Sequence, residues 1–493
     1  MNNIRLRFPP SPTGKFHIGS ARTALFSYLY ARKMGGTFVL RLEDTDQSRS
    51  TKEFEENIME GMEWLGLNWD EGPIPGTNKY KGDFAPYRQI ERFREGLYQP
   101  YIDKLFKEDR AYYCYCTPEE LEEEKKAQAE KKEAPKYTGK CRECSKEKIE
   151  QYEKEGRSKV VRLRLNPEII KYKDIIKGDI EFDMALYGDP VIVRSDGMPL
   201  YNFVVVVDDL TMKITHVIRG EDHISNTPIQ IAIYKALGAG VPEFGHLPLT
   251  LTPDKKKMSK RFGDISIDKY KKEGYLKEAL INFAALLGWS SGTEQEIYSK
   301  EELEKVFSLA RVQKSNAIFD VERLNWLNGV WIRKLSLDRI TAECIPYLKE
   351  AKLINDDFDR IYVEKVISLV KERLKILSEV IDLTAYFFKD LVLNPEKLVF
   401  RKSTIETTKQ GLEDVIILFE DTPMSKWPLN VDEMNNLMNE AKNMHNLSNG
   451  DVFWPVRYAL SFSEASPSPA ELLTVLPKEV SLKRLKAALK SLS

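Results

Sequence analysis

The start of the chain constrains the fold most, because a short strand, a proline-rich loop, a helix and a second strand follow one another there. Residues 4–8 (Ile-Arg-Leu-Arg-Phe) are typical of a short strand, and the prolines at positions 9, 10 and 12 forbid regular structure after it. From Ser20 the apolar residues follow a helical period until the Gly35-Gly36 pair, and residues 37–42 form an apolar, strand-like run. This opening predicts a parallel, doubly wound nucleotide-binding sheet.

The length of the chain predicts several domains. A single hydrophobic core rarely serves 493 residues, and 42% hydrophobic residues are enough to fill more than one. We find neither a signal peptide nor an apolar run long enough for a bilayer, so we expect a cytoplasmic protein that does not use a membrane. The 75 basic and 76 acidic residues balance, which argues against a purely electrostatic nucleic-acid binder but not against local phosphate contacts.

Two segments in the middle of the chain interrupt and then resume the sheet. A highly charged helix is predicted over residues 118–132, and strand-like segments such as 160–165 favour an inserted α+β module around it. The apolar run 200–207, closed by Asp208-Asp209, predicts a buried strand, and residues 214–218 predict another. We expect both to belong to the interrupted parallel sheet.

The last part of the chain, after about residue 265, is predicted to be helical almost to its end. A helix array of this kind is a common form for a rigid surface that binds RNA or protein. Its amphipathic segments are residues 276–287, 362–380 and 482–492.

The loop before the first helix is the first candidate for chemistry. His17 lies just before the predicted helix N-terminus, where unpaired N–H groups can bind phosphate. Gly14 and Gly19 would let a ligand approach the backbone closely. Taken alone, the segment is equally compatible with an ordinary strand–helix turn that carries a structural histidine.

A basic segment at residues 255–261 (Lys-Lys-Lys-Met-Ser-Lys-Arg) is the second candidate. Such runs are usually solvated loops. A mobile lysine loop can also close over a pyrophosphate leaving group and neutralise the charge that builds in a transition state.

Together the two segments resemble the HIGH and KMSKS signatures of the class I aminoacyl-tRNA synthetases. The resemblance extends over essentially the whole chain, and its further motifs are similar to those of the bacterial-type glutamyl-tRNA synthetase family. These motifs lie at residues 7–14 (Arg-Phe-Pro-Pro-Ser-Pro-Thr-Gly), 41–46 (Arg-Leu-Glu-Asp-Thr-Asp), 206–209, 218–223 (Ile-Arg-Gly-Glu-Asp-His), 319–328 and 455–460. Two positions depart from the family pattern, Ser20 in place of the second histidine of the signature and Pro9 in place of an alanine.

The resemblance implies roles for individual residues in ATP binding and catalysis. His17, Lys257 and Lys260 would contact the ATP phosphates, Gly19 would pack under the adenosine, and Ser259 would belong to the same ATP-binding segment. The family activates its amino acid with ATP and Mg²⁺, so both are expected here.

The resemblance also implies a pocket for L-glutamate. Arg7 and Tyr201 would hold the γ-carboxylate, Glu43 would pair with the α-ammonium, and Ser11 and Arg219 would complete the pocket. An arginine fork matches a carboxylate bidentately. A site built around that charge should reject glutamine, which would leave buried donors unpaired.

The implied reaction is glutamate activation followed by transfer to tRNA-Glu by a monomeric enzyme. A non-discriminating enzyme that also loads tRNA-Gln shares all of these motifs. A small nucleotidylyltransferase would have no use for the long helical region. A non-catalytic tRNA-binding paralogue would be expected to lose His17, Lys260 or Glu43, and all three are present.

Four of the five cysteines are clustered, at Cys114, Cys116, Cys141 and Cys144. Because disulfides are rare in cytoplasmic proteins, the cluster indicates a metal site rather than disulfides. A Cys-x-Cys pair followed by Cys-x-x-Cys can form a tetrahedral Cys₄ site, and we favour structural zinc over four free thiols. Many glutamyl enzymes carry zinc in this inserted module, with Cys144 here in the place of the fourth ligand. Cys344 stands apart in a helical segment and is predicted to be a small core residue.

The predicted architecture is multidomain, a class I Rossmann-type parallel sheet with an α+β insertion and then a helical anticodon-binding region. In that region Arg373 matches an arginine that the family uses against the third anticodon base. The expected domains are residues 1–110 and 196–250 for the two halves of the catalytic domain, 111–195 for the acceptor-stem module, 251–325 for a stem-contact domain with the lysine loop, and 326–390 and 391–493 for two anticodon-binding subdomains.

Overall fold

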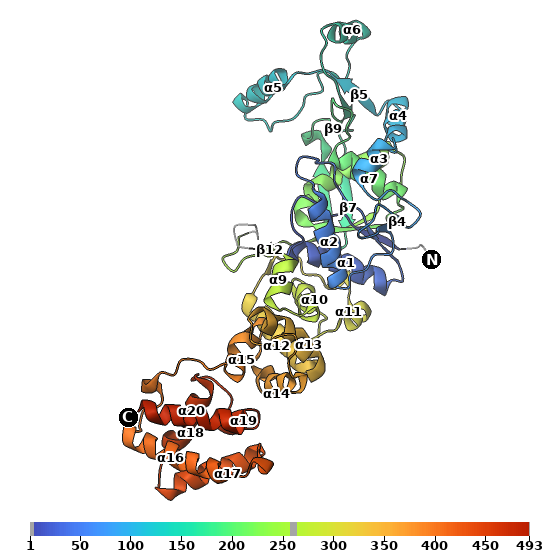
Figure 1. The fold of residues 1–493 in the computed structure, drawn as a ribbon. Coiled ribbons are helices and arrows are strands. Elements are labelled where there is room, and N and C mark those ends of the chain that lie inside the picture. Colours follow the sequence, from blue (N-terminus) through green and yellow to red (C-terminus); the bar gives the residue numbers. More distant parts are fainter. Residues whose placement is uncertain (1–3, 257–263, 493) are drawn as a thin grey trace. The chain divides into compact units, whose positions relative to one another are not determined.

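The computed structural model describes residues 4–256 and 264–492. The chain forms two compact units, of which the first comprises Met1–Lys271 with Lys277–Val321 and the second Lys272–Leu276 with Glu322–Ser493. The first unit contains sheets and helices and the second contains helices, as Figure 1 shows. Among the described helices, none is both long and apolar enough to cross a membrane.

A six-stranded sheet is the frame of the first unit. Its strands in spatial order are β2 (Thr37–Leu40), β1 (Arg5–Phe8), β10 (His216–Gly220), β11 (Glu243–Leu247), β7 (Ile169–Asp174) and β8 (Gly178–Asp183). The first five strands run parallel, and β8 is antiparallel to β7 at the edge. The predicted parallel sheet is therefore confirmed.

Helix α1 (Ile18–Lys33) connects β1 to β2, as the opening of the sequence predicts. The glycine pair turns the chain after the helix. Gly35 has a φ of +61°, and the N–H of Gly36 donates to the carbonyl of Ala31 at 2.8 Å. A Cβ on Gly36 would lie only 2.4 Å from the carbonyl oxygen of Ile4, so this position requires glycine.

Short elements fill the chain between β2 and the inserted segment. Helices α3 and α4 matter most for the site, because they supply partners for a buried aspartate described below. The elements are α2 (Lys52–Trp64), β3 (Gly72–Pro73), β4 (Tyr80–Lys81), α3 (Gln89–Arg94) and α4 (Gln99–Lys107).

The predicted strand at residues 200–207 is wrong, because this segment forms helix α7 (Tyr201–Thr211). Every residue from 203 to 209 is buried, so this part of the helix has no face exposed to solvent. A short apolar run without alternation is compatible with a buried strand and with a buried helix, and periodicity cannot separate the two. The next predicted strand, at 214–218, is confirmed as β10, and α8 (Thr227–Ala236) connects it to β11.

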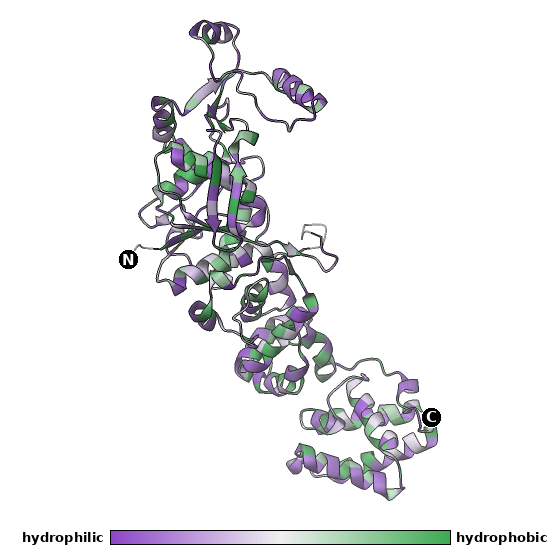
Figure 2. Cartoon of the chain, turned by 180° about the vertical axis from the view of Figure 1, so that it is seen from behind, coloured by the Kyte–Doolittle hydropathy of each residue, from purple (hydrophilic) through white to green (hydrophobic). Residues whose placement is uncertain are grey.

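The inserted segment contains a small antiparallel sheet of three strands, β5 (Ala111–Cys114), β6 (Val160–Leu163) and β9 (Val191–Val193). The predicted charged helix is confirmed as α5 (Pro118–Glu130), and α6 (Lys146–Lys154) follows it. Both helices are mostly hydrophilic in Figure 2. The β7–β8 hairpin lies between β6 and β9 in the sequence but belongs to the six-stranded sheet, where β7 pairs with β11.

The first unit ends with a short parallel strand pair and three helices. Helix α10 confirms the helix predicted at 276–287 and packs against α1, but residues 279–285 are all buried, so the predicted amphipathic pattern is wrong here. These elements are β12 (Thr250–Leu251), α9 (Ile267–Glu273), α10 (Lys277–Leu286), α11 (Lys300–Val306) and β13 (Ala317–Ile318).

The helical C-terminal region is confirmed. Its helices are α12 (Val321–Lys334), α13 (Leu337–Glu350), α14 (Arg360–Val370), α15 (Val380–Phe388), α16 (Ile405–Asp421), α17 (Val431–Met444), α18 (Asn449–Ser461), α19 (Pro469–Leu473) and α20 (Lys478–Ser491). Cys344 is fully buried in α13, as expected for a core residue.

The segment predicted as one amphipathic stretch at 362–380 is divided, because α14 ends at Val370 and α15 begins at Val380. Two tertiary hydrogen bonds explain the break. The Asn328 amide donates to the carbonyl of Lys375 at 2.6 Å, and the N–H of Leu377 donates to the carbonyl of Gly274 at 3.0 Å. Since these backbone groups have partners in other segments, they do not continue the helix.

Candidate active site

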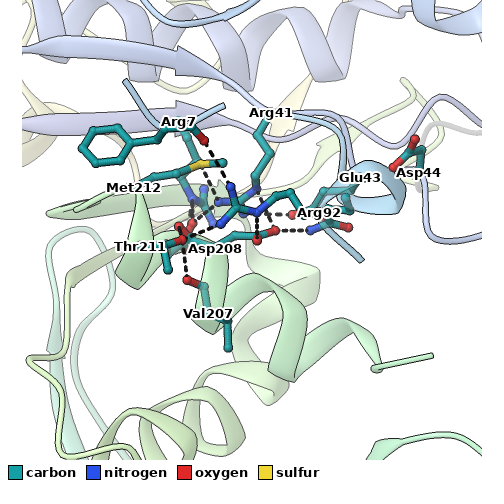
Figure 3. A network of polar contacts seen from close by, with 12 residues as sticks. Arg7, Arg41, Glu43, Asp44, Arg92, Val207, Asp208, Thr211 and Met212 are labelled. Carbon is teal, nitrogen blue, oxygen red and sulfur yellow. Dashed lines mark hydrogen bonds and ion pairs between the residues drawn. The ribbon is translucent and has the colours of Figure 1, made fainter. Parts of the chain in front are cut away.

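A cluster of buried charges lies where β1, β2 and α7 meet, and Figure 3 shows it from close by. The Nε of Arg7, on β1, donates to both carboxylate oxygens of Asp209 at 3.1 and 3.2 Å. Arg41, which follows β2, donates from Nη1 to Asp209 Oδ1 at 2.5 Å and from Nη2 to Glu43 Oε1 at 3.1 Å. The helix α7 thus supplies the carboxylate that fixes two arginines at the ends of two parallel strands.

Asp208, the neighbour of Asp209 on α7, is fully buried and has its own partners. Arg92 donates to Asp208 Oδ1 at 2.7 Å, Tyr98 donates to the same oxygen at 3.0 Å, and Gln89 donates to Oδ2 at 2.8 Å. Because Gln89 and Arg92 lie on α3 and Tyr98 directly precedes α4, Asp208 ties α7 to these two helices, and its ion pair with Arg41 at 3.6 Å also ties it to the end of β2.

Seven charged residues define this cluster, four buried arginines and three buried carboxylates, which leaves one positive charge in excess when all are ionised. Nη1 of Arg7 and Nη1 of Arg219 are buried without a hydrogen-bond partner among the described residues. Buried cationic donors are expensive to leave unpaired. Such an arrangement favours an anionic ligand that accepts from both guanidinium groups. The charged residues are Arg7, Arg41, Arg92, Arg219, Glu43, Asp208 and Asp209.

The carboxylates of the cluster differ in their tendency to ionise. Burial raises the pKa of Glu43, and the nearby Arg41 and Arg7 only partly oppose this effect. Burial also acts to raise the pKa of Asp209, but Arg7 and Arg41 outweigh it and the pKa is lowered. The paired arginines therefore favour the charged form of Asp209, whereas Glu43 would be stabilised in its charged form by an additional cation.

Tyr201 opens helix α7 and lies beside this cluster. Its hydroxyl is 3.2 Å from His223 Nδ1. Tyr201 is 36% exposed as a whole, but burial of its phenol group raises its pKa to about 12. The hydroxyl therefore keeps its proton near pH 7 and can donate a hydrogen bond. Burial and the charge of Arg219 lower the pKa of His223 to about 4, so its imidazole is neutral near pH 7.

His17 caps the N-terminus of α1, where a phosphate could bind. Its Nδ1 accepts the N–H of Ser20 at 3.3 Å, and the Ser20 hydroxyl lies 3.0 Å from its Nε2. A Cβ on Gly19 would lie 3.3 Å from the His17 ring, so the glycine leaves room for the imidazole across the helix end. Ser11, at the start of the same loop, is exposed.

Lys257, Ser259 and Lys260 lie outside the described residues, so the structure does not place them. The chain that follows this segment returns to the His17 loop. Ser266 forms a bridge with His17, and the N–H of Ile18 donates to the carbonyl of Ile265 at 3.2 Å. Residues 265 and 266, which follow the basic segment in the sequence, thus contact the proposed phosphate-binding loop.

Three of the four clustered cysteines meet beside β5. The sulfur atoms of Cys114, Cys116 and Cys141 lie within 4.8 Å of one another. The hydroxyl of Tyr137 lies 3.4 Å from the Cys114 sulfur and accepts the N–H of Cys141 at 2.8 Å. Cys144 packs at the edge of the group, with its sulfur 3.8 Å from the carbonyl of Lys140. Three thiols at this spacing fit zinc, which binds thiolates about 2.3 Å away.

Arg373 lies in the second unit, in the short 3-10 turn after α14. Its Nη2 donates to the carbonyl of Ser466 at 2.8 Å, and its Nη1 donates to the carbonyl of Ala465 at 3.3 Å. Arg457 donates to the same Ser466 carbonyl at 2.6 Å. Two arginines therefore stand side by side at this loop, and the charge of Arg373 contributes, after burial, to lowering the pKa of Arg457.

Comparison with known proteins decides the family. The family model described as "tRNA synthetases class I (E and Q), catalytic domain" matches residues 3–326, and an "Anticodon binding domain" model matches residues 339–489. The chain is 42% identical over 492 residues to "Glutamate--tRNA ligase 2" of Thermoanaerobacter pseudethanolicus, covering 99% of this chain and 98% of that protein. The chain belongs to the glutamate–tRNA ligase family of class I tRNA synthetases.

Further relatives agree with this membership. A "Glutamate--tRNA ligase" of Heliobacterium modesticaldum is 43% identical, covering 99% of this chain and 97% of that protein. The crystal structure of a glutamate tRNA ligase from Elizabethkingia meningosepticum in complex with its amino acid matches with a TM-score of 0.88 and 32% identity over 100% of both chains. The resemblance to the family and the predicted fold class are confirmed.

Three residues of the buried charged cluster were assigned no role from the sequence, although they lie within its motifs. Arg41, Asp208 and Asp209 lie inside quoted motifs, yet their function as the buried frame around Arg7 is visible only in three dimensions. The signal in the sequence was the pair of acidic residues that closes an apolar run. Two acidic residues at the end of a buried apolar run indicate that cationic side chains elsewhere in the chain pair with them, because buried carboxylates need such partners.

Proposed function

We propose that this protein is a glutamate–tRNA ligase, which activates L-glutamate with ATP and transfers it to the 3′ end of tRNA-Glu. The observation that carries the proposal is the buried cluster with one positive charge in excess. In it, Nη1 of Arg7 and of Arg219 have no hydrogen-bond partner in the part of the chain that the structure describes, and the carboxylate of Glu43 belongs to the same cluster. The names of the full-length relatives support the same activity.

L-glutamate complements this cluster in charge. Its γ-carboxylate would accept from Arg7 and from the Tyr201 hydroxyl, and its α-ammonium would pair with Glu43. Ser11 and Arg219 would complete the pocket. An uncharged glutamine amide at the same place would leave the excess positive charge unbalanced and would turn N–H donors toward cationic donors. We therefore expect strong discrimination against glutamine.

In the first step, an oxygen of the glutamate α-carboxylate attacks the α-phosphorus of ATP. An oxygen–phosphorus bond forms, the bond between the α-phosphorus and the bridging oxygen breaks, and pyrophosphate leaves with its Mg²⁺. His17 at the α1 N-terminus would bind phosphate oxygens, and Gly19 would allow the adenosine to approach. Lys257, Ser259 and Lys260 would stabilise the charge of the leaving group.

In the second step, a hydroxyl of the terminal ribose of tRNA attacks the carbonyl carbon of glutamyl-adenylate. The ester bond to tRNA forms, and AMP leaves with the electron pair of the broken carbon–oxygen bond. The chain contributes mainly by holding both reactants in register, because a bound pair reacts far faster than a free one.

The remaining parts of the chain would bind tRNA. We propose the catalytic domain at 1–110 and 196–250, an acceptor-stem module at 111–195, a stem-contact domain at 251–325, and anticodon-binding subdomains at 326–390 and 391–493. Arg373 would face an anticodon base, and Cys114, Cys116 and Cys141, with Cys144 as the fourth ligand, would hold a structural zinc ion. We further propose a cytoplasmic monomer.

The test is glutamate charging of purified tRNA-Glu and tRNA-Gln transcripts with ATP and Mg²⁺. Charging of tRNA-Glu alone is the expected result and establishes a discriminating enzyme. Charging of both transcripts keeps the mechanism but requires a later step that corrects the misloaded tRNA-Gln. If neither transcript is charged, and glutamine is also inert, the enzyme proposal is wrong and a non-catalytic tRNA-binding protein remains.

A further inference from the structure

A chain of buried polar side chains connects Arg219 to Asp174 by way of His246. Asp174 closes β7, His246 lies on β11, Arg219 lies on β10, and Thr227 opens α8. Each of the four is at most 5% exposed. Since β7, β11 and β10 are parallel neighbours, their carboxyl ends bring these residues together at one edge of the sheet.

Asp174 is the fixed end of this chain. Its Oδ2 lies 2.6 Å from Nδ1 of His246. Its Oδ1 accepts the backbone N–H groups of Ile176 at 2.9 Å and Lys177 at 2.8 Å. The carboxylate is thus saturated with donors and anchored to the turn of the β7–β8 hairpin. Burial acts to raise its pKa, but the hydrogen bonds of His246 and of Lys177 outweigh it and the pKa is lowered.

The contacts of His246 determine its tautomer. Its Nε2 lies 3.2 Å from Nε of Arg219 and 3.1 Å from the Thr227 hydroxyl. An arginine only donates, so Nε2 must be the acceptor and the single ring proton must be on Nδ1, facing Asp174. Burial lowers the pKa of His246, which agrees with a neutral imidazole.

Arg219 is therefore oriented by two of its three nitrogens. Nε donates to His246, and Nη2 donates to the Thr227 hydroxyl at 2.8 Å. The guanidinium carbon lies 5.4 Å from the centre of the Phe244 ring, which limits rotation of the plane. Nη1 alone has no partner among the described residues. Arg219 interacts electrostatically with Tyr201, Arg7 and Glu43, which belong to the proposed glutamate pocket.

We propose that His246 and Asp174 are positioning residues that, together with Thr227, hold Arg219 so that its Nη1 faces a carboxylate of the bound amino acid. This inference rests on the proposed function. His246 touches no substrate in this scheme. It fixes the direction of the arginine, and Asp174 fixes the tautomer that allows His246 to accept. We call Asp174, His246 and Thr227 the relay. Its loss should weaken binding of the amino acid and leave the binding of ATP and of tRNA unchanged.

The test compares His246→Leu with His246→Gln in steady-state aminoacylation. Leucine removes the acceptor, and we expect the KM for glutamate to rise about tenfold or more, the loss typical of one hydrogen bond to a charged group. The KM values for ATP and tRNA should stay within about twofold. Glutamine can place an amide oxygen near the position of Nε2, so it should recover part of the loss. Asp174→Asn should raise the glutamate KM severalfold.

His216→Leu is the matched control, because His216 is a buried histidine that begins strand β10, whereas Arg219 lies near the other end of that strand. The His216 ring contacts Tyr30, which has no part in the proposed relay. It should leave the KM for glutamate unchanged. Equal increases of all three KM values in His246→Leu and His246→Gln, or the same glutamate KM in His246→Leu and wild type, would overturn the proposal.

A milder pair keeps the test decisive if His246→Leu does not fold. Thr227→Val removes the acceptor for Nη2 together with the hydroxyl contacts to His246 Nε2 and to the carbonyl of His223, and Thr227→Ser retains all three. Only the valine variant should therefore raise the glutamate KM. Calorimetric titration with glutamate provides a second readout. If wild type neither binds nor transfers glutamate, the proposed function has failed. If the wild-type protein binds and transfers glutamate and Thr227→Val has the same glutamate KM and affinity, the positioning proposal is wrong and the proposed function stands.

Discussion

Replacement of Arg7 by glutamine tests the charge balance of the site. Arg7 is 1% exposed, and it reaches Asp209 only through Nε, so its Nη1 remains for a ligand. The change removes the excess positive charge and leaves arginines and carboxylates of the cluster equal in number. We expect weaker binding of glutamate and less discrimination against glutamine.

The magnitude follows from the contacts. A hydrogen bond to a charged group contributes about 1.5–3 kcal/mol, which predicts a rise in the glutamate KM of roughly tenfold to 150-fold. Breaking a buried ion pair costs about 3–5 kcal/mol when the remaining charge has no other partner. Asp209 keeps Arg41 at 2.5 Å, so we expect the loss of folding stability to be below that range.

Arg5→Gln is the matched control on the same strand. Arg5 is 7% exposed, but its Nη1 and Nη2 both donate to Glu71 and its Nε donates to the carbonyl of Met212. Its loss should lower stability and leave the glutamate KM unchanged. The assay measures KM for glutamate and glutamine, together with thermal unfolding. The reasoning is refuted if folded Arg7→Gln keeps the wild-type KM, or if both variants raise it equally.

Three further predictions concern other parts of the chain. Because burial raises the pKa of Glu43, the KM for glutamate should rise as the pH falls through that raised value, and a pH profile of Glu43→Gln should lack this bend. Cys116→Ser should lose bound zinc, measured by metal analysis of the purified protein, whereas Cys344→Ala, in another core, should retain it. Gly411→Ala should destabilise the helical unit by about 1–3 kcal/mol, since its Cβ would lie 2.3 Å from the carbonyl oxygen of Asp451. An unchanged unfolding temperature would contradict this last prediction, because helix propensity alone favours alanine.

Local patterns in the sequence were sufficient for the opening of the sheet and for the helical C-terminal region. The order of strand, proline loop, helix and glycine pair is visible in one continuous segment. The amphipathic period of residues 482–492, most of which lie in α20, is likewise a property of neighbouring residues. These features depend on backbone preferences and on one buried face, both of which neighbouring residues determine. The motifs around His17 and Glu43 were likewise visible as continuous segments.

Tertiary structure decided what depends on contacts between distant residues. The run 200–207 lies in a helix in which residues 203–209 are all buried, and its apolar residues carry no period that distinguishes a buried helix from a buried strand. The partners Arg7 and Asp209 are 202 residues apart, and Asp174 and His246 are 72 apart. Sequence spacing does not say which buried charges will meet, since a pairing of this kind forms only when the strands and α7 pack together. The residue types of the site were therefore readable in the chain, but the positions of their charges were set by the fold.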